Sequence, residues 1–84
     1  MQIYMQAFPG ENKPPRFYQL ILQQDLLGGW TVIREWGTQG KSGRVKQEIH
    51  PSREAAVDAM IKLRDVQLAR GFQVVYLRGD APIS

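Results

Sequence analysis

Residues 16–50 read RFYQLILQQDLLGGWTVIREWGTQGKSGRVKQEIH, and this stretch decides the fold because it holds three strand signals in a row. Residues 16–23 alternate along most of their length, and residues 30–36 are rich in aromatic and β-branched types, which favour strands. Residues 44–50 alternate throughout. Short glycine-containing turns separate the three segments, so we expect an antiparallel meander.

The first predicted strand has two different sides. Tyr18, Leu20 and Leu22 fall on one side at the period of two that a strand imposes. Phe17 and Ile21 fall on the other side, so we expect that face to be partly covered as well.

The last strand of the meander separates uncharged side chains from charged ones. Val45, Gln47 and Ile49 point one way. We expect the opposite side to be the wet, mostly basic, outward face of the hairpin, and it carries Arg44, Lys46, Glu48 and His50.

The chain before the meander predicts one more strand and a loop. Residues 2–8 alternate loosely, which predicts an edge strand. Residues 9–15 contain Pro9-Gly10 and Pro14-Pro15. Proline has no backbone N–H and a fixed φ, so this segment predicts a loop.

A helix is predicted directly after the meander. The Ser52 hydroxyl suits the N-cap position, and Glu54 suits the positive end of the helix dipole. The helix is expected over residues 53–70, and Gly71 at C′ would stop it. Its apolar residues recur at helical spacing and are Ala56, Ala59, Met60, Leu63 and Val66.

The order of elements predicts the fold class. Residues 72–77 predict a last short strand, and residues 79–84 a tail. Four strands, a helix and a strand predict an α+β fold, in which a small antiparallel sheet has a single α-helix packed on one face and the other face exposed. The 84 residues form a single domain, 1–84, with its core in residues 16–78.

Composition limits the classes of function. The chain has no cysteine and one histidine, which excludes a disulfide framework and argues against a zinc site. No apolar run approaches the ~18 residues that a membrane span needs, and the amino terminus has no signal-peptide pattern. We therefore expect a cytoplasmic protein with no membrane association and no metal.

Positive charge is concentrated in one part of the chain. The net charge is +3, and the segment from Arg34 to Arg53 holds five basic residues against two acidic ones. The remainder of the chain holds equal numbers of each. Such clustering is typical of an anion or nucleic-acid binder, although a basic soluble face explains the charge alone equally well.

The sequence predicts no enzyme. The acidic residues are scattered, and no two have the short spacing that suits paired acid–base chemistry. Ser42 lies in a turn and Ser52 at a helix cap, with no base placed beside them. His50 precedes a proline at a strand end and is expected to be solvated. We expect no catalytic residue, no cofactor and no small-molecule substrate.

The turn at residues 36–44, WGTQGKSGR, combines three glycines with Lys41 and Arg44. Glycine lets backbone N–H groups approach an anion closely, and the cations would add charge. A strand rather than a helix follows, so the segment is not a phosphate loop of the nucleotide-hydrolase type. An ordinary hairpin turn explains the same residues and, taken alone, is the better interpretation.

Two tryptophans occur in one predicted strand. Trp30 and Trp36 are six residues apart and so point to the same side. Trp36 lies at the expected strand end, where an aromatic ring among basic residues can stack on a sugar or base while the cations hold phosphates. A core position is the better interpretation for Trp30, and for Trp36 the two interpretations are even.

These features occur together in a known family. The residues concerned are Phe17-Tyr18-x-Leu20-x-Leu22, Gly28-Gly29-Trp30, Arg34-x-Trp36-Gly37, Gly40, and a helix opened by Ser52-x-x-Ala55 and closed near Arg70-Gly71-Phe72. The pattern covers residues 16–72 and resembles the WGR domain, a sheet with one helix across it. That domain occurs in DNA-dependent poly(ADP-ribose) polymerases, where it binds DNA near a break, often at a 5′-phosphorylated end.

The resemblance implies roles for individual residues. Trp36 would pack on a terminal sugar, Arg34 would support the nearby backbone, and Arg16 would contact phosphate. Two positions depart from the family pattern: Thr38 replaces the arginine of the name triplet, and Pro15 stands where an asparagine usually precedes the basic position. No polymerase domain is present in the sequence, so ADP-ribosyl transfer is not expected of this chain.

Our hypothesis is therefore a non-catalytic nucleic-acid-binding module that binds DNA, at ends or nicks, through phosphate contacts and tryptophan stacking. The alternative is a protein–protein interaction or dimerisation module, with a protein partner or a second copy and no nucleic acid. Phosphate binding weakens steeply with salt, whereas an apolar protein interface does not. The expected nucleic-acid-binding residues are Arg16, Arg34, Trp36, Lys41, Arg44 and Lys46.

Overall fold

The computed structural model describes residues 1–79, which form a five-stranded antiparallel sheet and one helix. The expected tail lies, apart from Gly79, outside the described residues. The elements are β1 (Gln2–Ala7), β2 (Arg16–Gln24), β3 (Trp30–Thr38), β4 (Arg44–His50), α1 (Arg53–Ala69) and β5 (Gln73–Arg78).

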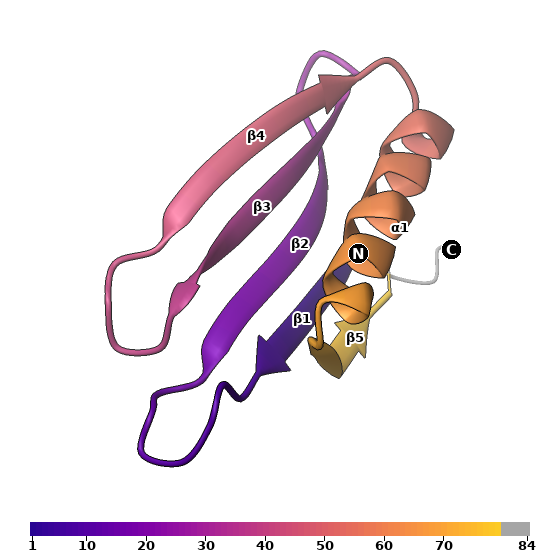
Figure 1. Cartoon of the computed structure of the whole chain (residues 1–84). Coiled ribbons are helices and arrows are strands. Elements are labelled where there is room, and N and C mark those ends of the chain that lie inside the picture. Colours follow the sequence, from indigo (N-terminus) through magenta and orange to yellow (C-terminus); the bar gives the residue numbers. More distant parts are fainter. Residues whose placement is uncertain (80–84) are drawn as a thin grey trace.

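The strand order in the sheet is β4-β3-β2-β1-β5, and α1 lies across one face of it (Figure 1). Neighbouring strands are antiparallel throughout, and β2, β3 and β4 form the predicted meander. The α+β fold class is confirmed. Because only two residues link β4 to α1, the helix begins beside the end of β4. The helix then runs back across the sheet, and β5 follows it.

The position of β1 differs from the prediction. β1 pairs with β2 on one side and with β5 on the other, so it is an interior strand rather than an edge. The sequence of residues 2–8 carries no sign of this, because the second neighbour arrives only after the helix has crossed the sheet. The strand ends at Ala7, before Pro9, and Phe8 is 67% exposed.

Several predicted boundaries move by one or two residues, and two of them bear on the site. β3 continues through Thr38, because Gly37 pairs with Phe17 and Thr38 pairs with Arg16. Phe72 was expected to open the last strand, but it is buried in the core and β5 begins at Gln73.

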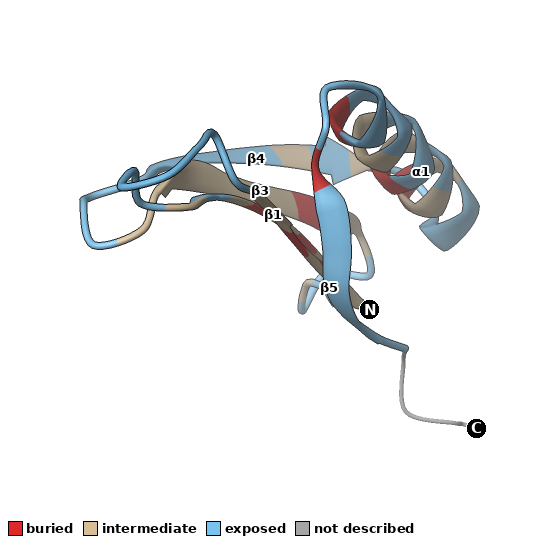
Figure 2. Ribbon diagram, turned by 60° about the horizontal axis from the view of Figure 1, so that its bottom comes forward, coloured by how far each residue is buried: buried red, intermediate tan, exposed pale blue. Residues whose placement is uncertain are grey.

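The hydrophobic core lies between the sheet and α1, where Figure 2 shows the buried positions facing each other. Tyr18, Leu20 and Leu22 are buried as predicted, while Phe17 and Ile21 on the opposite side are half-buried. Within residues 1–79, the buried apolar residues are Ile3, Met5, Tyr18, Leu20, Leu22, Val32, Ala56, Met60 and Phe72.

The helix is capped as the sequence predicts. The Ser52 hydroxyl accepts from the N–H of Ala55 at 3.1 Å, and Gly71 after the helix has a φ of +97°, which suits glycine at C′. Ala56 and Met60 are fully buried, whereas Val66 is 46% exposed although the apolar stripe includes it. Gln67 is buried in its place, at 6% exposure.

The faces of β4 are opposite to the prediction. Cross-strand partners point to the same face, and Glu48 is the partner of Val32, which lies in the core under the helix. The basic side of β4 is therefore the helix side of the sheet. Val45 and Ile49 lie on the open face and are 59% and 77% exposed. The predicted alternation of β4 is confirmed, but alternation does not show on which side of the sheet the helix packs.

The open face carries a row of side-chain hydrogen bonds. Gln2 Nε2 donates to Gln19 Oε1 at 2.9 Å, and Gln19 Nε2 donates to Glu35 Oε1 at 2.8 Å. The Tyr4 ring stacks between those of Phe17 and Tyr76, with centroids 6.4 and 5.5 Å away. This face is therefore built from amides and rings.

Candidate nucleic-acid interface

The predicted binding residues of the strands gather on the helix side of the sheet. The register pairs Arg34 with Lys46 and Trp36 with Arg44, and each pair shares one face with the buried Val32. Arg16, two residues before Tyr18, shares that face through β2. The helix covers only part of this side, so these residues lie beside it.

A groove of about 810 Å³ opens between this part of the sheet and the carboxyl end of α1. Among the described residues that line it, four have cationic side chains, Arg16, Arg34, Lys46 and Arg70, and none is acidic. The remaining lining residues come from the β1–β2 loop, the centre of the sheet and the end of the helix, and are Ala7, Phe8, Pro9, Phe17, Tyr18, Trp36, Gly37, Gln67, Gly71 and Phe72.

Trp36 lies in the floor of this groove. Its ring stacks on that of Tyr18, with the centroids 5.8 Å apart and an interplanar angle of 21°. The Tyr18 ring in turn meets Phe72 edge-on at 6.1 Å. Trp36 is therefore half-buried against the core and also lines the groove. For this residue, a core position and a position beside a ligand site do not exclude each other. Trp36 stands in an interior strand two residues before the strand ends, not at the end itself.

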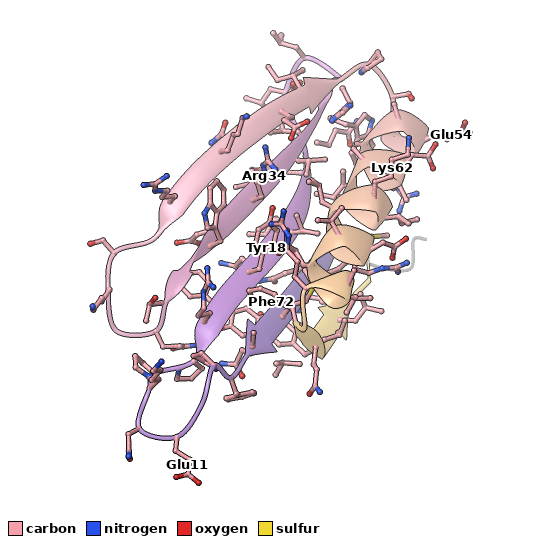
Figure 3. The ribbon with its side chains drawn as sticks, viewed as in Figure 1. Glu11, Tyr18, Arg34, Glu54, Lys62 and Phe72 are labelled. Carbon is pink, nitrogen blue, oxygen red and sulfur yellow. The ribbon has the colours of Figure 1, made fainter. Side chains whose placement is uncertain are left out.

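Arg34 is held between an aromatic ring and a carboxylate. Its guanidinium carbon lies 5.6 Å from the centroid of the Trp36 ring, and its Nη2 lies 3.6 Å from Glu48 Oε1. The Nε of Arg34 is buried and, among the described residues, meets no hydrogen-bond acceptor. The side chain thus keeps donor capacity that the protein does not use. Figure 3 shows Arg34, Tyr18 and Phe72 following one another from β3 towards the end of α1.

The other two predicted cations lie outside the groove. Lys41 is exposed in the β3–β4 turn, where its N–H donates to the carbonyl of Thr38 at 3.1 Å. Arg44 is exposed on β4, opposite Trp36 and on the same face. The structure thus brings together Arg16, Arg34, Trp36 and Lys46, with Arg44 beside them on the sheet and Lys41 at its end.

Sequence reasoning missed the contribution of the helix end. Arg70, the C-cap residue of α1, and Gln67 both line the groove. The Gly71 stop signal fixes where the helix ends in the sequence. It does not show that this end lies over Tyr18 and Trp36, because that depends on the direction in which the helix crosses the sheet.

The glycines flanking the β3–β4 turn have a steric role. A Cβ on Gly37 would lie 3.0 Å from the Cα of Gly43, and a Cβ on Gly43 would lie 2.8 Å from the carbonyl oxygen of Trp36. Atoms of the Phe17 ring lie within 3.6 Å of where either Cβ would stand. These contacts fit the plain hairpin interpretation, in which glycine allows the close approach of the strands and of Phe17.

His50 is less exposed than the sequence suggested. Its side chain is 20% exposed, and its Nε2 lies 3.8 Å from Glu48 Oε2. Within residues 1–79, no three histidine, cysteine or acidic side chains are grouped as a metal ion would need. No helix in the same residues is long and apolar enough to cross a membrane.

The family model of the WGR domain matches residues 1–76, which is most of the chain. No curated protein and no solved structure matches it. The chain therefore belongs to the WGR-domain family, and the match extends beyond residues 16–72 to include β1 and most of β5. WGR domains are non-catalytic modules, and membership suggests a nucleic-acid-binding role in general.

Proposed function

We propose that this WGR domain binds DNA at ends or nicks through the groove between the sheet and the carboxyl end of α1. The observation that carries the proposal is the grouping of four cations and a half-buried tryptophan in a groove with no acidic lining residue. Arginine and lysine on a backbone-sized groove are the electrostatic footprint of a phosphate binder.

The cations would hold the sugar–phosphate backbone. Arg16 and Arg70 reach the groove from different elements, Arg16 from β2 and Arg70 from the end of α1. Lys46 lies next to Arg34 across the β3–β4 pair, so that two cations stand side by side on the sheet. Arg44 and Lys41 would extend the positive surface beyond the groove towards the β3–β4 turn.

Trp36 would provide a stacking surface for the sugar of a terminal nucleotide. Tyr18 supports the ring from within the core, which fixes its position before any ligand arrives. A terminal nucleotide exposes one face of its base and sugar, whereas a nucleotide inside an intact duplex has a neighbour on both sides. This difference favours ends and nicks over continuous DNA.

The fold gives no element for reading base sequence. α1 packs its buried side on the sheet through Ala56 and Met60, so it cannot enter a major groove as a recognition helix does. Contacts to phosphate and sugar position a protein without reading sequence. We therefore expect binding with little base preference.

Binding should be measured on nicked, blunt-ended, single-stranded and intact circular DNA across a salt series. Four phosphate contacts predict a slope of about −3 to −4 in a plot of log affinity against log salt for duplex DNA. Nicked and blunt-ended DNA should bind more tightly than the circle. An affinity that salt does not change would overturn the proposal.

A protein-interaction role is the second candidate, and the open face of the sheet supports it. Val45 and Ile49 are large, apolar and more than half exposed there, and between β1 and β4 the face carries one charged side chain, that of Glu35. A surface of this kind offers nothing to phosphate. The two candidates use different faces and are compatible.

A further inference from the structure

β4 is an open edge of the sheet. It pairs with β3 through an unbroken register from Trp30–His50 to Trp36–Arg44, and no strand of the described residues lies on its other side. The opposite edge, β5, has a register shift against β1 between Tyr4 and Met5. Such irregularities bend a strand and discourage pairing, whereas a regular edge presents free backbone N–H and C=O groups.

The centre of β4, VKQEI, is complementary to itself when read in the opposite direction, and the flanking Arg44 and His50 would lie opposite each other. If two copies pair antiparallel about Gln47, Lys46 of one copy lies opposite Glu48 of the other. Val45 likewise meets Ile49 of the second copy, and Gln47 meets its own counterpart. Opposite-charge pairs are among the cross-strand combinations that stabilise an antiparallel ladder, and the Val45–Ile49 pairs would bury apolar surface.

We propose that β4 is a dimerisation edge, at which two copies of this chain join their sheets by antiparallel pairing of β4 with β4 about Gln47. The interface is isologous: each copy offers the same strand, so two Lys46–Glu48 pairs and two Val45–Ile49 pairs form together. Charge complementarity selects a second copy as the occupant. A strand with cations alone on its charged side would repel its own copy.

The ends of β4 limit the pairing to this one strand. Pro51 follows directly and has no backbone N–H, and the β3–β4 turn precedes it with Gly43. The two-fold axis is perpendicular to the sheet, because paired residues share a face. Both helices, and both grooves, therefore lie on one side of the joined sheet. The proposal concerns the free protein and does not depend on DNA binding.

A charge-reversal experiment tests the pairing directly, by sedimentation velocity over a concentration series. Lys46→Glu places two acids opposite each other at both pairs, and Glu48→Lys places two lysines there. Each variant alone should dimerise at least about tenfold more weakly than the wild type. An equimolar mixture of the two should form heterodimers, and the double variant K46E/E48K should dimerise again.

Matched controls separate the interface from net charge and from folding. Lys62→Glu and Glu11→Lys make the same charge changes at exposed positions away from β4, on α1 and in the β1–β2 loop, and should dimerise as the wild type does. Val45→Ser with Ile49→Ser alters only exposed side chains on the open face and should also weaken the dimer about tenfold. Far-UV circular dichroism checks the fold of each variant.

Three results would overturn the proposal. The first is a wild type that stays monomeric up to about 1 mM. The second is a dimer that is as tight in Lys46→Glu and in the serine double variant as in the controls Lys62→Glu and Glu11→Lys. The copies would then meet through another surface. The third is a mixture of the two charge-reversal variants that remains monomeric.

Discussion

At the scale of single residues, the site depends on a tryptophan that serves the core and the groove together. The Trp36 ring is fixed by Tyr18 beneath it and accompanied by Arg34 at 5.6 Å. A ring held in this way loses little rotational freedom when a sugar stacks on it, which raises the affinity that one contact can provide. As a consequence, the binding role and the structural role of Trp36 cannot be removed separately by truncating the side chain.

The structural role and the binding role of Trp36 can be separated by comparison with Trp30. Trp30 lies on the same strand and the same face as Trp36, is also half-buried against the core, and packs near Arg53 at the far end of the sheet. Trp36→Ala and Trp30→Ala should each lower the free energy of unfolding by about 1–3 kcal/mol, because each removes a partly buried ring. Urea unfolding measures that loss.

Only Trp36→Ala should also weaken DNA binding, by about tenfold or more, since a stacked base or sugar contributes ~1–3 kcal/mol. Binding is measured by titration of a labelled nicked duplex under conditions in which both variants remain folded. Equal losses of affinity in the two variants would mean that stability alone is responsible, and Trp36 would then leave the site.

Thr38 tests whether the family site can be restored. It stands opposite Arg16 in the β2–β3 pair and so shares the face that bears Trp36. Thr38→Arg would add a planar guanidinium beside Arg16, and such a group can bind a phosphate through two hydrogen bonds. We expect tighter binding to 5′-phosphorylated DNA ends, measured against the same ends without the phosphate.

Thr31→Arg is the matched control for this change. Thr31 lies on the same strand but on the open face, where its cross-strand partners are Gln23 and Ile49. The control adds equal charge far from the groove and should not distinguish phosphorylated from unphosphorylated ends. A gain that both variants share would be an effect of net charge rather than of the site.

At the scale of elements, the sequence predicted most of what local patterns can encode. β4 matches residue for residue, and the N-cap at Ser52 and the stop at Gly71 are confirmed. These features depend on neighbouring residues only. The interior position of β1 and the burial of Gln67 depend on where α1 crosses the sheet, which is a long-range property that no short pattern contains.

The candidate site, too, could be predicted only as far as local sequence patterns reach. Period-two alternation already placed Arg34 with Trp36, and Lys46 with Arg44, on common sides of their strands. The contribution of Arg70 was missed because it reaches the groove only through the path of the helix. The predicted orientation of β4 is wrong for a related reason. Alternation determines which residues share a face, but it does not determine which face the helix covers.

The contact between helix and sheet should be unevenly distributed along α1. Met60 is fully buried and Val66 is 46% exposed, although both belong to the apolar stripe. Met60→Ala should reduce the free energy of unfolding by about 2–5 kcal/mol through a cavity under the helix. Val66→Ala should cost less than about 1 kcal/mol, because little area is lost from a site open to water. Urea midpoints of the two variants that shift by equal amounts would contradict this packing.

At the scale of the whole molecule, the sheet separates two chemically different surfaces. On the helix side stand the groove cations together with Arg44, and their charge is offset locally by Glu48 beside Arg34. On the open side, the hydrogen-bonded row of Gln2, Gln19 and Glu35 and the stacked ring of Tyr4 present a nearly neutral surface. Within residues 1–79, the cations of β2, β3 and β4 are thus gathered on one side of the sheet in an elongated domain.

This difference between the two faces predicts which amide signals change when DNA binds. In a heteronuclear NMR titration with a short duplex that has a 5′-phosphorylated end, amide shifts should concentrate on residues 16–18, 34–38, 44–46 and 70–72. Positions on the open face at the opposite end of the sheet, such as Gln23 and Thr31, should move little, because no cation among β1 to β4 lies on that face to attract phosphate.

The same titration at raised salt should reduce every groove shift together, since all of them report one binding event driven by counterion release. Titration with a free nucleoside, which carries no phosphate, serves as the control and should leave the spectrum nearly unchanged. If the duplex instead perturbs Tyr4 and Tyr76 most strongly, the stacked rings of the open face are the nucleic-acid surface. The proposed role of the basic groove would then be wrong, because its exposed cations Arg16, Lys46 and Arg70 would not have attracted the phosphates.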